Sequence, residues 1–363
     1  MTLRIAAIIE DPGAANGMVG VNDALTLRGA EIDIYATGAA QAYAANIGLA
    51  TLDLDDLAVP LGADALLVGT SENPDSPVFA VTHAARKAGI PCFGFIDGPA
   101  NAAHRFRGRT DTPLTHAPDF LLVSDPAAAA AYAKLGFDAD KITVVGHPNM
   151  DRVRARAVEL SSEGRPKVRA RLFPNLDPTR PLIVFLAETS DGLDPAEFKR
   201  SDAYILTGRG GSDGRTEICL EETLDALPAA APDAALVLRL HPKNDADAFK
   251  PYADEIAAIS IGGDPLEVVF AADLVIGMTS VLLFEAAVMS RPALSVTPRP
   301  DEAAWLSSIA LGLTPQVCSA DTLRASIAEA MKGRMPGSGD IDALVPTGAA
   351  ARMADAILHR LAD

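Results

Sequence analysis

The sequence has few cysteines and no long apolar run, and these two absences exclude several classes of protein. Among its 363 residues there are 3 cysteines, which lie far apart and form no CxxC pair. We therefore expect neither a disulfide framework nor a zinc site, and we expect a reduced, cytoplasmic location. An apolar strand begins almost at once, so neither a signal peptide nor a membrane span is expected, while peripheral membrane association stays open.

Basic residues are also scarce. The chain has 31 Lys and Arg against 48 Asp and Glu, which gives a formal net charge of −17. A nucleic-acid partner is not expected, because phosphate contacts along nucleic acid require clustered Lys and Arg. A small anionic ligand is compatible with this charge, since it needs only a local pocket.

Short apolar runs alternate with helical segments along the whole chain, which predicts an α/β fold with parallel sheets. We expect two Rossmann-like, doubly wound domains that face a cleft, with ligands at the carboxyl ends of the strands. The arginine-rich stretch 152–180 marks the boundary and a hinge. The predicted parts are an N-terminal domain 1–160, a linker 161–180, a C-terminal domain 181–347 and a C-terminal helix 348–363.

The expected strands are short and apolar, and the expected helices lie between them. The predicted strands are 3–9, 32–35, 65–68, 91–96, 120–123, 142–145, 182–186, 235–240, 274–276 and 293–296. The predicted helices are 18–28, 76–88, 126–135, 216–227, 264–270, 323–332 and 349–361. Residues 10–17 are predicted to form a turn, because they are rich in Gly, Pro and Asn.

Two acidic side chains of the first half stand directly after predicted strands. Asp11 follows strand 3–9 and Asp97 follows strand 91–96. Because catalytic groups of open sheets lie at the carboxyl ends of strands, both are candidates for the catalytic base. Both residues also occur as ordinary turn formers. The basic side chains of 104–109 either meet an anion or belong to a solvated loop.

The stretch 273–296 reads as a strand, a tight turn, a helix and a second strand. Thr279 and Ser280 stand where the helix begins, and a hydroxyl there caps an amide of the first turn. The free N–H groups and positive dipole end of such a helix suit a phosphate, and Glu285 is placed to reach a ribose. The alternative is an ordinary strand–helix–strand unit in which the hydroxyl only caps the helix and contacts no ligand.

Two further stretches of the second half are candidate contacts for an anion. In the glycine-dense loop before helix 216–227, Gly210 and Gly211 let backbone amides approach a ligand, and Arg215 adds donors. The loop lacks the ending of a Walker A motif, and a mobile surface loop is the alternative. After strand 235–240, His241-Pro242-Lys243 adds an imidazole and an amine.

The order and spacing of these motifs resemble the GT-B nucleotide-sugar enzymes. The His-Pro motif followed by a Ser/Thr motif is similar to polysialyltransferase-like, capsular Kdo-transferase-like and CDP-glycerol glycerophosphotransferase-like proteins. The resemblance implies that His241, with Lys243 nearby, and the hydroxyls of Thr279 and Ser280 hold the donor's phosphate. The non-hydrolysing UDP-N-acetylglucosamine 2-epimerases share this architecture and are similar too.

We therefore expect a metal-independent glycosyltransferase that uses a nucleotide-activated sugar, with no further cofactor and an unidentified acceptor, in surface glycan or glycoconjugate synthesis. A convincing DxD triplet, typical of metal-dependent transferases, is missing from the sequence. Two alternatives remain open: a nucleotide-sugar epimerase on the same fold, and a non-catalytic nucleotide-sugar binder.

Overall fold

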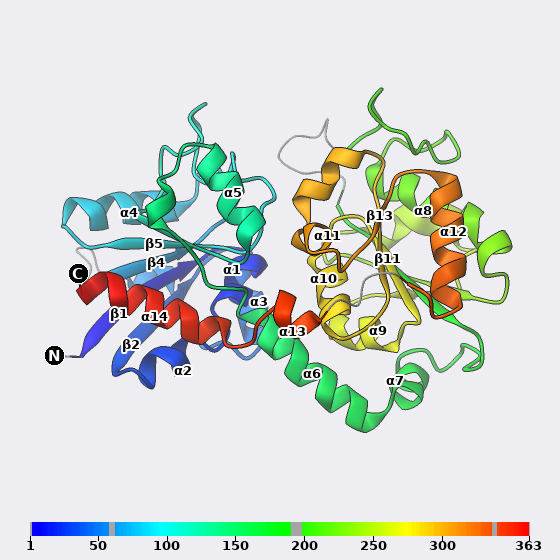
Figure 1. The fold of residues 1–363 in the computed structure, drawn as a ribbon, viewed down its shortest axis with the longest axis horizontal. Coiled ribbons are helices and arrows are strands. Elements are labelled where there is room, and N and C mark those ends of the chain that lie inside the picture. Colours follow the sequence, from blue (N-terminus) through cyan, green and yellow to red (C-terminus); the bar gives the residue numbers. More distant parts are fainter. Residues whose placement is uncertain (1, 58–61, 190–197, 336–339, 363) are drawn as a thin grey trace. The chain divides into compact units, whose positions relative to one another are not determined.

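The computed structural model describes residues 2–57, 62–189, 198–335 and 340–362, and it divides into two compact units. Unit 1 comprises Met1–Arg152 and Val345–Asp363, and unit 2 comprises Val153–Leu344. Each unit contains one parallel sheet covered by helices (Figure 1). The predicted fold class, α/β with two Rossmann-like domains, is confirmed. The expected cleft stays a prediction.

Unit 1 has a seven-stranded sheet in the order β3-β2-β1-β4-β5-β6-β7. Its strands are β1 (Leu3–Ile9), β2 (Ala30–Ala36), β3 (Leu52–Asp53), β4 (Ala65–Gly69), β5 (Cys92–Ile96), β6 (Phe120–Val123) and β7 (Ile142–Val144). Its helices are α1 (Pro12–Gly17), α2 (Val21–Thr26), α3 (Ala39–Asn46), α4 (Pro77–Lys87), α5 (Pro126–Lys134) and α14 (Ala349–Ala362), with 3-10 turns Leu54–Asp56 and Ala139–Lys141.

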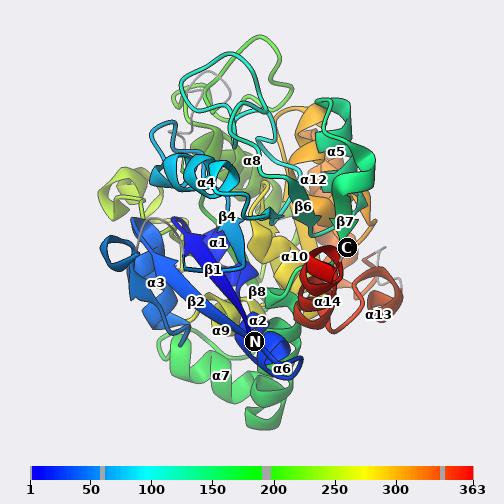
Figure 2. The same ribbon diagram turned by 90° about the vertical axis from the view of Figure 1, so that its left-hand side faces the viewer.

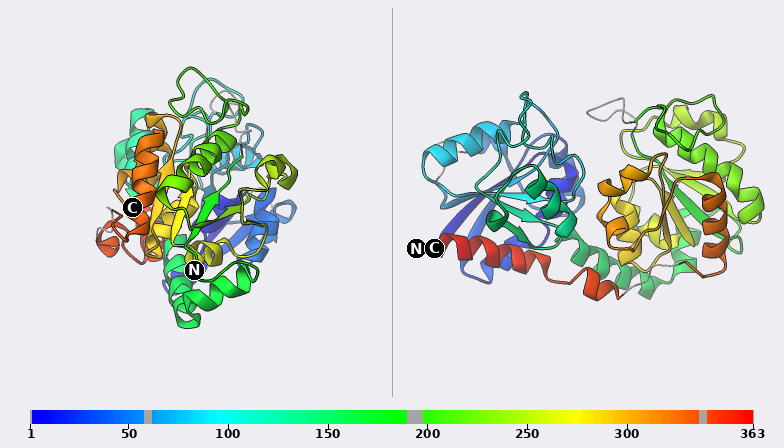
Figure 3. Two further views of the ribbon diagram at one scale, coloured as in Figure 1. Left: turned by 90° about the vertical axis from the view of Figure 1, so that its right-hand side faces the viewer. Right: turned by 45° about the horizontal axis from the view of Figure 1, so that its top comes forward.

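The alternation of side chains along β1 explains how unit 1 buries both faces of its sheet. Ile5 and Ile9 pack into a core with α1, α2, α3 and α14, while Ile8 packs on the opposite face with α4. Figure 2 shows α2 and α3 beside β1 and β2, and Figure 3 shows the C-terminal helix lying along the same unit. The last helix is therefore part of the core of the first half.

Unit 2 has a six-stranded sheet in the order β10-β9-β8-β11-β12-β13. Its strands are β8 (Leu182–Leu186), β9 (Ala235–Arg239), β10 (Ala258–Ser260), β11 (Leu274–Gly277), β12 (Ala293–Val296) and β13 (Gln316–Val317). Its helices are α7 (Arg165–Leu172), α8 (Arg215–Ala230), α9 (Pro265–Ala271), α10 (Val281–Val288), α11 (Ser307–Ala310), α12 (Ala320–Met331) and α13 (Ile341–Leu344), with 3-10 helices Ala246–Tyr252 and Pro300–Trp305. Helix α6 (Asn149–Glu163) runs across the division between the units.

Helices α8 and α12 pack together over the core of unit 2, which includes Phe185 from β8 and Leu238 from β9. Helices α9 and α10 also pack together and contact the central strands. In the described part of the chain, none of the helices combines the length and the apolar character needed to cross a membrane. All three cysteines are free.

Three boundaries differ from the sequence prediction. Residues 12–17 form helix α1 and not a turn, because Asp11 caps the helix and Pro12 takes its first position, where no N–H is needed. The expected linker 161–180 lies within unit 2, which begins at Val153; its helix α7 ends at Leu172 as the sequence predicted, and Arg165 and Arg169 of that helix both pair with Asp273. The C-terminal helix belongs to unit 1, as its buried side chains require.

Candidate functional site

The carboxyl ends of β1, β4 and β5 in unit 1 bring several polar side chains together. These strands are neighbours and parallel, so the residues that follow them share one edge of the sheet. Asp11 follows β1, Thr70 follows β4 and Asp97 follows β5. Both predicted catalytic carboxylates therefore lie at the edge where the sequence analysis placed them.

Gly13 shows how close the two carboxylates are. A Cβ atom added to Gly13 would lie 2.2 Å from Asp97 Oδ2 and 3.5 Å from Asp11 Oδ1. The two oxygens are therefore at most 5.7 Å apart, the sum of those two distances. Any side chain at position 13 would collide with Asp97, so the glycine is what allows α1 to begin beside this carboxylate.

Arg105 holds Asp97 in place. Its guanidinium is almost fully buried, and Nη1 donates to Asp97 Oδ1 and to Thr70 Oγ1, each at 2.7 Å. In contrast, Arg109 pairs with Asp75 at the surface. The basic stretch 104–109 is thus divided: Arg105 belongs to the buried cluster, and Arg109 belongs to the solvated loop.

Burial changes the ionisation of this cluster. It raises the pKa of Asp11 from 3.8 to about 6, with the nearby charge of Asp97 acting in the same direction. Burial also lowers the pKa of His147, which follows β7 and is 7% exposed. His147 Nδ1 accepts from the N–H of Asn149 at 3.2 Å, which places its proton on Nε2. A carboxyl group with a pKa near 6 is suited to proton transfer near neutral pH.

In unit 2, the start of helix α10 holds a carboxylate of the chain itself. Ser280 caps the helix, and Glu188, which follows β8, reaches the same place. Glu188 Oε1 accepts from the N–H groups of Met278, Thr279 and Ser280 at 3.2, 2.7 and 2.8 Å. Glu285 lies one turn further along α10 and is 3% exposed. The predicted phosphate position thus has the geometry of an anion site, and Glu188 occupies it.

Arg215 lies behind this carboxylate in a buried ion network. It is 1% exposed, and it donates to Glu188 Oε2 at 3.0 Å, to Thr279 Oγ1 at 3.1 Å and to Glu302 Oε2 at 2.7 Å. Arg299 also donates to Glu302, at 2.9 Å. The sequence analysis expected Arg215 to donate to a ligand; in the structure its guanidinium is engaged by the protein. Glu302 lies 87 residues further along the chain, so no local pattern indicated this pairing.

The glycine-dense loop is held by acidic side chains of α8. Glu222 Oε1 accepts from the N–H groups of Thr207 and Gly208, and Glu221 Oε2 accepts from that of Arg209. The amides that precede Gly210 and Gly211 are therefore already bonded. The proposed contact of Gly210 and Gly211 with a ligand stays a prediction.

The His-Pro motif lies at the same edge of the sheet as the start of α10. His241 follows β9, which neighbours β8, and β8 neighbours β11. Pro242 and Lys243 are exposed, and Lys243 N donates to His241 Nδ1 at 3.2 Å. Asn244 Nδ2 donates to the backbone oxygen of Glu188 at 3.3 Å. Glu188 is thus the residue that connects the two predicted motifs, and its place directly after a strand was the signal available in the sequence.

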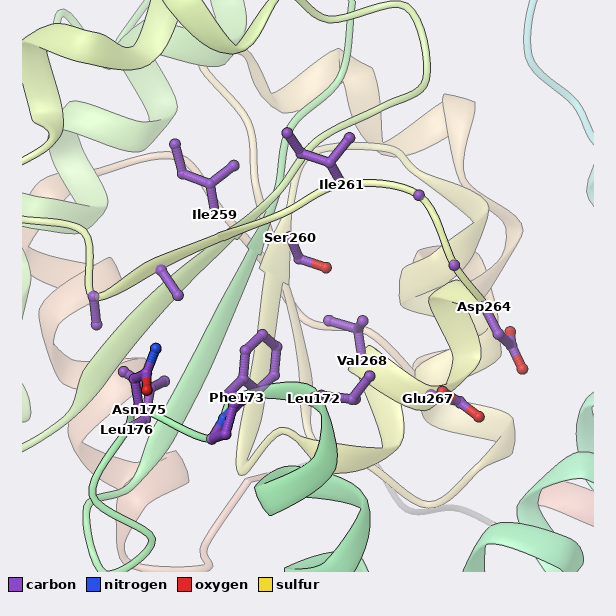
Figure 4. A pocket seen from close by; sticks show the side chains of 15 residues that line it. Leu172, Phe173, Asn175, Leu176, Ile259, Ser260, Ile261, Asp264, Glu267 and Val268 are labelled. Carbon is purple, nitrogen blue, oxygen red and sulfur yellow. The ribbon is translucent and has the colours of Figure 1, made fainter.

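A separate pocket of about 380 Å³ lies beside the edge strand of unit 2 (Figure 4). It is lined by the end of α7, by β10 and by the start of α9, with Phe173, Ile259 and Val268 among its side chains. The predicted site residues do not line this pocket.

Within the described residues, no group of three or more His, Cys, Asp and Glu side chains is arranged to hold a metal ion. The absence of a metal requirement stays a prediction.

Comparison with solved structures identifies the architecture as GT-B-type. The complex of S. aureus MnaA with UDP matches with a TM-score of 0.66 at 13% identity, covering 99% of this chain and 97% of that one. The UDP-GlcNAc 2-epimerase of Neisseria meningitidis, bound to UDP-GlcNAc, matches with a TM-score of 0.66 at 14% identity, covering 99% of this chain and 100% of that one.

A third similar structure is a variant of the wall teichoic acid polymerase TagF, with a TM-score of 0.54 at 15% identity, covering 99% of this chain and 89% of that one. No family model matches the sequence, and no curated protein does. At these identities the likeness shows the fold.

Proposed function

We propose that this protein is an enzyme acting on a nucleotide-activated sugar, and that its reaction is the epimerisation of a UDP-sugar. The observation that carries this proposal is the pair of carboxylates in unit 1, Asp11 and Asp97, whose oxygens lie at most 5.7 Å apart. The GT-B-type fold, which it shares with UDP-GlcNAc 2-epimerases, supports the choice of substrate class.

Inverting the carbon next to C1 of a UDP-sugar without a redox cofactor needs a base and an acid. The base removes the proton from that carbon, and the electron pair of the C–H bond forms a double bond to C1 as the C1–O bond breaks and UDP leaves. When UDP adds back to C1, a proton returns to the other face of the neighbouring carbon, so two groups of different protonation are required. With a pKa of about 6, Asp11 exchanges a proton readily near neutral pH. Asp97, fixed by Arg105, is the second group. In this proposal Asp11 and Asp97 transfer the protons, and Arg105 positions Asp97.

Unit 2 supplies the contacts for the nucleotide. The N–H groups at the start of α10, the hydroxyls of Thr279 and Ser280, and the side chains of His241 and Lys243 meet the phosphates. Helix N-termini bind phosphate through free N–H groups and a positive dipole end. Glu285 is the proposed contact to the ribose.

Glycosyl transfer is the second candidate. The order of the His-Pro and Thr-Ser motifs supports it, as does the fold shared with TagF. In that reaction Asp11 or Asp97 would remove a proton from the acceptor hydroxyl, and the unit 2 donors would stabilise the leaving phosphate. A cytoplasmic role in surface glycan or glycoconjugate synthesis belongs to this candidate.

Incubating the purified full chain with UDP-GlcNAc and no acceptor separates the candidates. Epimerisation produces a second UDP-sugar, which NMR of the anomeric protons detects. We expect Asp97→Asn to abolish this product. Asp75→Asn is the matched control, because it removes the same charge from a surface Asp–Arg pair of unit 1.

An unchanged UDP-GlcNAc spectrum with the wild-type protein would refute epimerisation of this substrate. If UDP binds while neither epimerisation nor transfer occurs, the protein is a non-catalytic binder.

A further inference from the structure

We propose that Glu188 is an internal competitor for the phosphate of the ligand. Its carboxylate takes the position at the start of α10 that a phosphate would take, and the ligand has to displace it. This inference rests on the proposed function, since it concerns the phosphate contact of that site, and it assigns a role in affinity to a residue outside the sequence motifs.

The contacts of Glu188 are those of a bound anion. One of its oxygens accepts from three successive N–H groups, those of Met278, Thr279 and Ser280, and the other accepts from Thr279 Oγ1 at 3.1 Å. Successive N–H groups that converge on one point form an anion-binding concavity. A phosphate oxygen would need the same donors, so Glu188 and a phosphate exclude each other here.

The charged side chains behind the start of α10 also oppose simultaneous binding of Glu188 and a phosphate. Arg215 and Arg299 carry two positive charges, Glu188 and Glu302 carry two negative ones, and the exposed Asp301 lies 4.0 Å from Arg299. The cluster therefore has no spare positive charge. A phosphate that arrived beside Glu188 would add uncompensated negative charge next to a carboxylate.

Glu188 is the member of this network that is able to leave. Its side chain is 17% exposed, whereas those of Arg215 and Glu302 are 1% and 0% exposed. Its backbone is held separately, because Thr216 Oγ1 donates to Glu188 O at 2.7 Å and lies 3.3 Å from Glu188 N. Rotation of the side chain alone would thus free the amides at the start of α10, while the backbone and the buried Arg215–Glu302 pair stay in place.

Inorganic pyrophosphate titrated into the full chain by calorimetry tests the competition. We expect Glu188→Ala to bind pyrophosphate at least about tenfold more tightly than wild type, because the donors are freed and Arg215 loses one counter-charge. Glu188→Gln keeps the shape and an acceptor but removes the charge, so its affinity should fall between the two. Glu329→Ala, which removes one surface carboxylate from unit 2, should bind like wild type.

Equal or weaker binding of pyrophosphate by both Glu188 variants would overturn the inference. Thermal unfolding of each variant checks that it is folded, and Glu188→Gln keeps the test valid if Glu188→Ala does not fold. Titration with UDP distinguishes this failure from failure of the proposed function. If UDP binds wild type and both variants equally, the nucleotide site stands and the competition is refuted. If the variants gain affinity for pyrophosphate and UDP never binds, the competition stands and the nucleotide proposal is refuted.

Discussion

Asp11 is a single residue whose ionisation the fold alters. Its pKa is about 6 in the folded protein against 3.8 without the fold, because burial and the charge of Asp97 disfavour the carboxylate. Well below pH 3.8 the carboxyl group is protonated in both the folded and the unfolded state, and it does not change the free energy of unfolding. As the pH rises through the interval from 4 to 6, the unfolded chain releases the proton first, and the folded state loses stability.

Replacement of this carboxyl by an amide should therefore stabilise the protein at high pH. Asn keeps the helix cap and resembles protonated Asp, so we expect Asp11→Asn to raise the free energy of unfolding by roughly 1–3 kcal/mol at about pH 8. At about pH 3, below the unfolded-state pKa, the two proteins should be nearly equally stable. Denaturant unfolding at both pH values measures this. A variant less stable than wild type at about pH 8 would contradict the raised pKa.

At the scale of elements, the sequence predicted the central strands well and the edges poorly. Strand β8 is apolar and buried throughout, and β1 is apolar and buried from Ile5 onward, after the exposed Arg4; the predicted bounds of both strands agree with the structure. Of the four edge strands, β7 was predicted, but β3, β10 and β13, which have only two or three residues each, were not. The positions of Asp11 and Asp97 in the candidate site were predictable, because both residues follow predicted strands. The Arg215–Glu302 pair was not predictable, because it depends on tertiary packing.

The glycine-dense loop yields a prediction about two neighbouring residues. Gly210 has a φ of +83°, a conformation that side chains disfavour, whereas Gly211 does not have a positive φ. A Cβ atom at either position would meet no atom within 4 Å. We expect Gly210→Ala to cost about 1–2 kcal/mol of stability and Gly211→Ala to cost little. Thermal unfolding compares them, and equal losses would show that the backbone conformation is not the cause.

At the scale of the whole molecule, the two ends of the chain build one unit. Helix α14 buries Met353 and Ile357 in the core of unit 1, and Asp355 pairs with Arg28, which follows α2. The sequence predicted this helix but not its partner, because α14 has no local signal that tells which sheet it covers.

Truncating a buried side chain of α14 should destabilise unit 1. Ile357 is fully buried, so we expect Ile357→Ala to cost about 2–5 kcal/mol. Leu361→Ala, on a partly buried residue of the same helix, should cost less. Denaturant unfolding measures both losses. An effect of Ile357→Ala no larger than that of Leu361→Ala would contradict the packing of α14 described here.

The nucleotide role of unit 2 is tested most directly by calorimetric titration of UDP into the full chain and into His241→Ala. The account predicts that UDP binds wild type at one site and that His241→Ala weakens this binding by roughly 1.5–3 kcal/mol, the range of a hydrogen bond to a charged group. His83→Ala, which replaces an exposed histidine of unit 1, should bind UDP like wild type. An unchanged dissociation constant in His241→Ala, or the absence of UDP binding by wild type, would contradict the account.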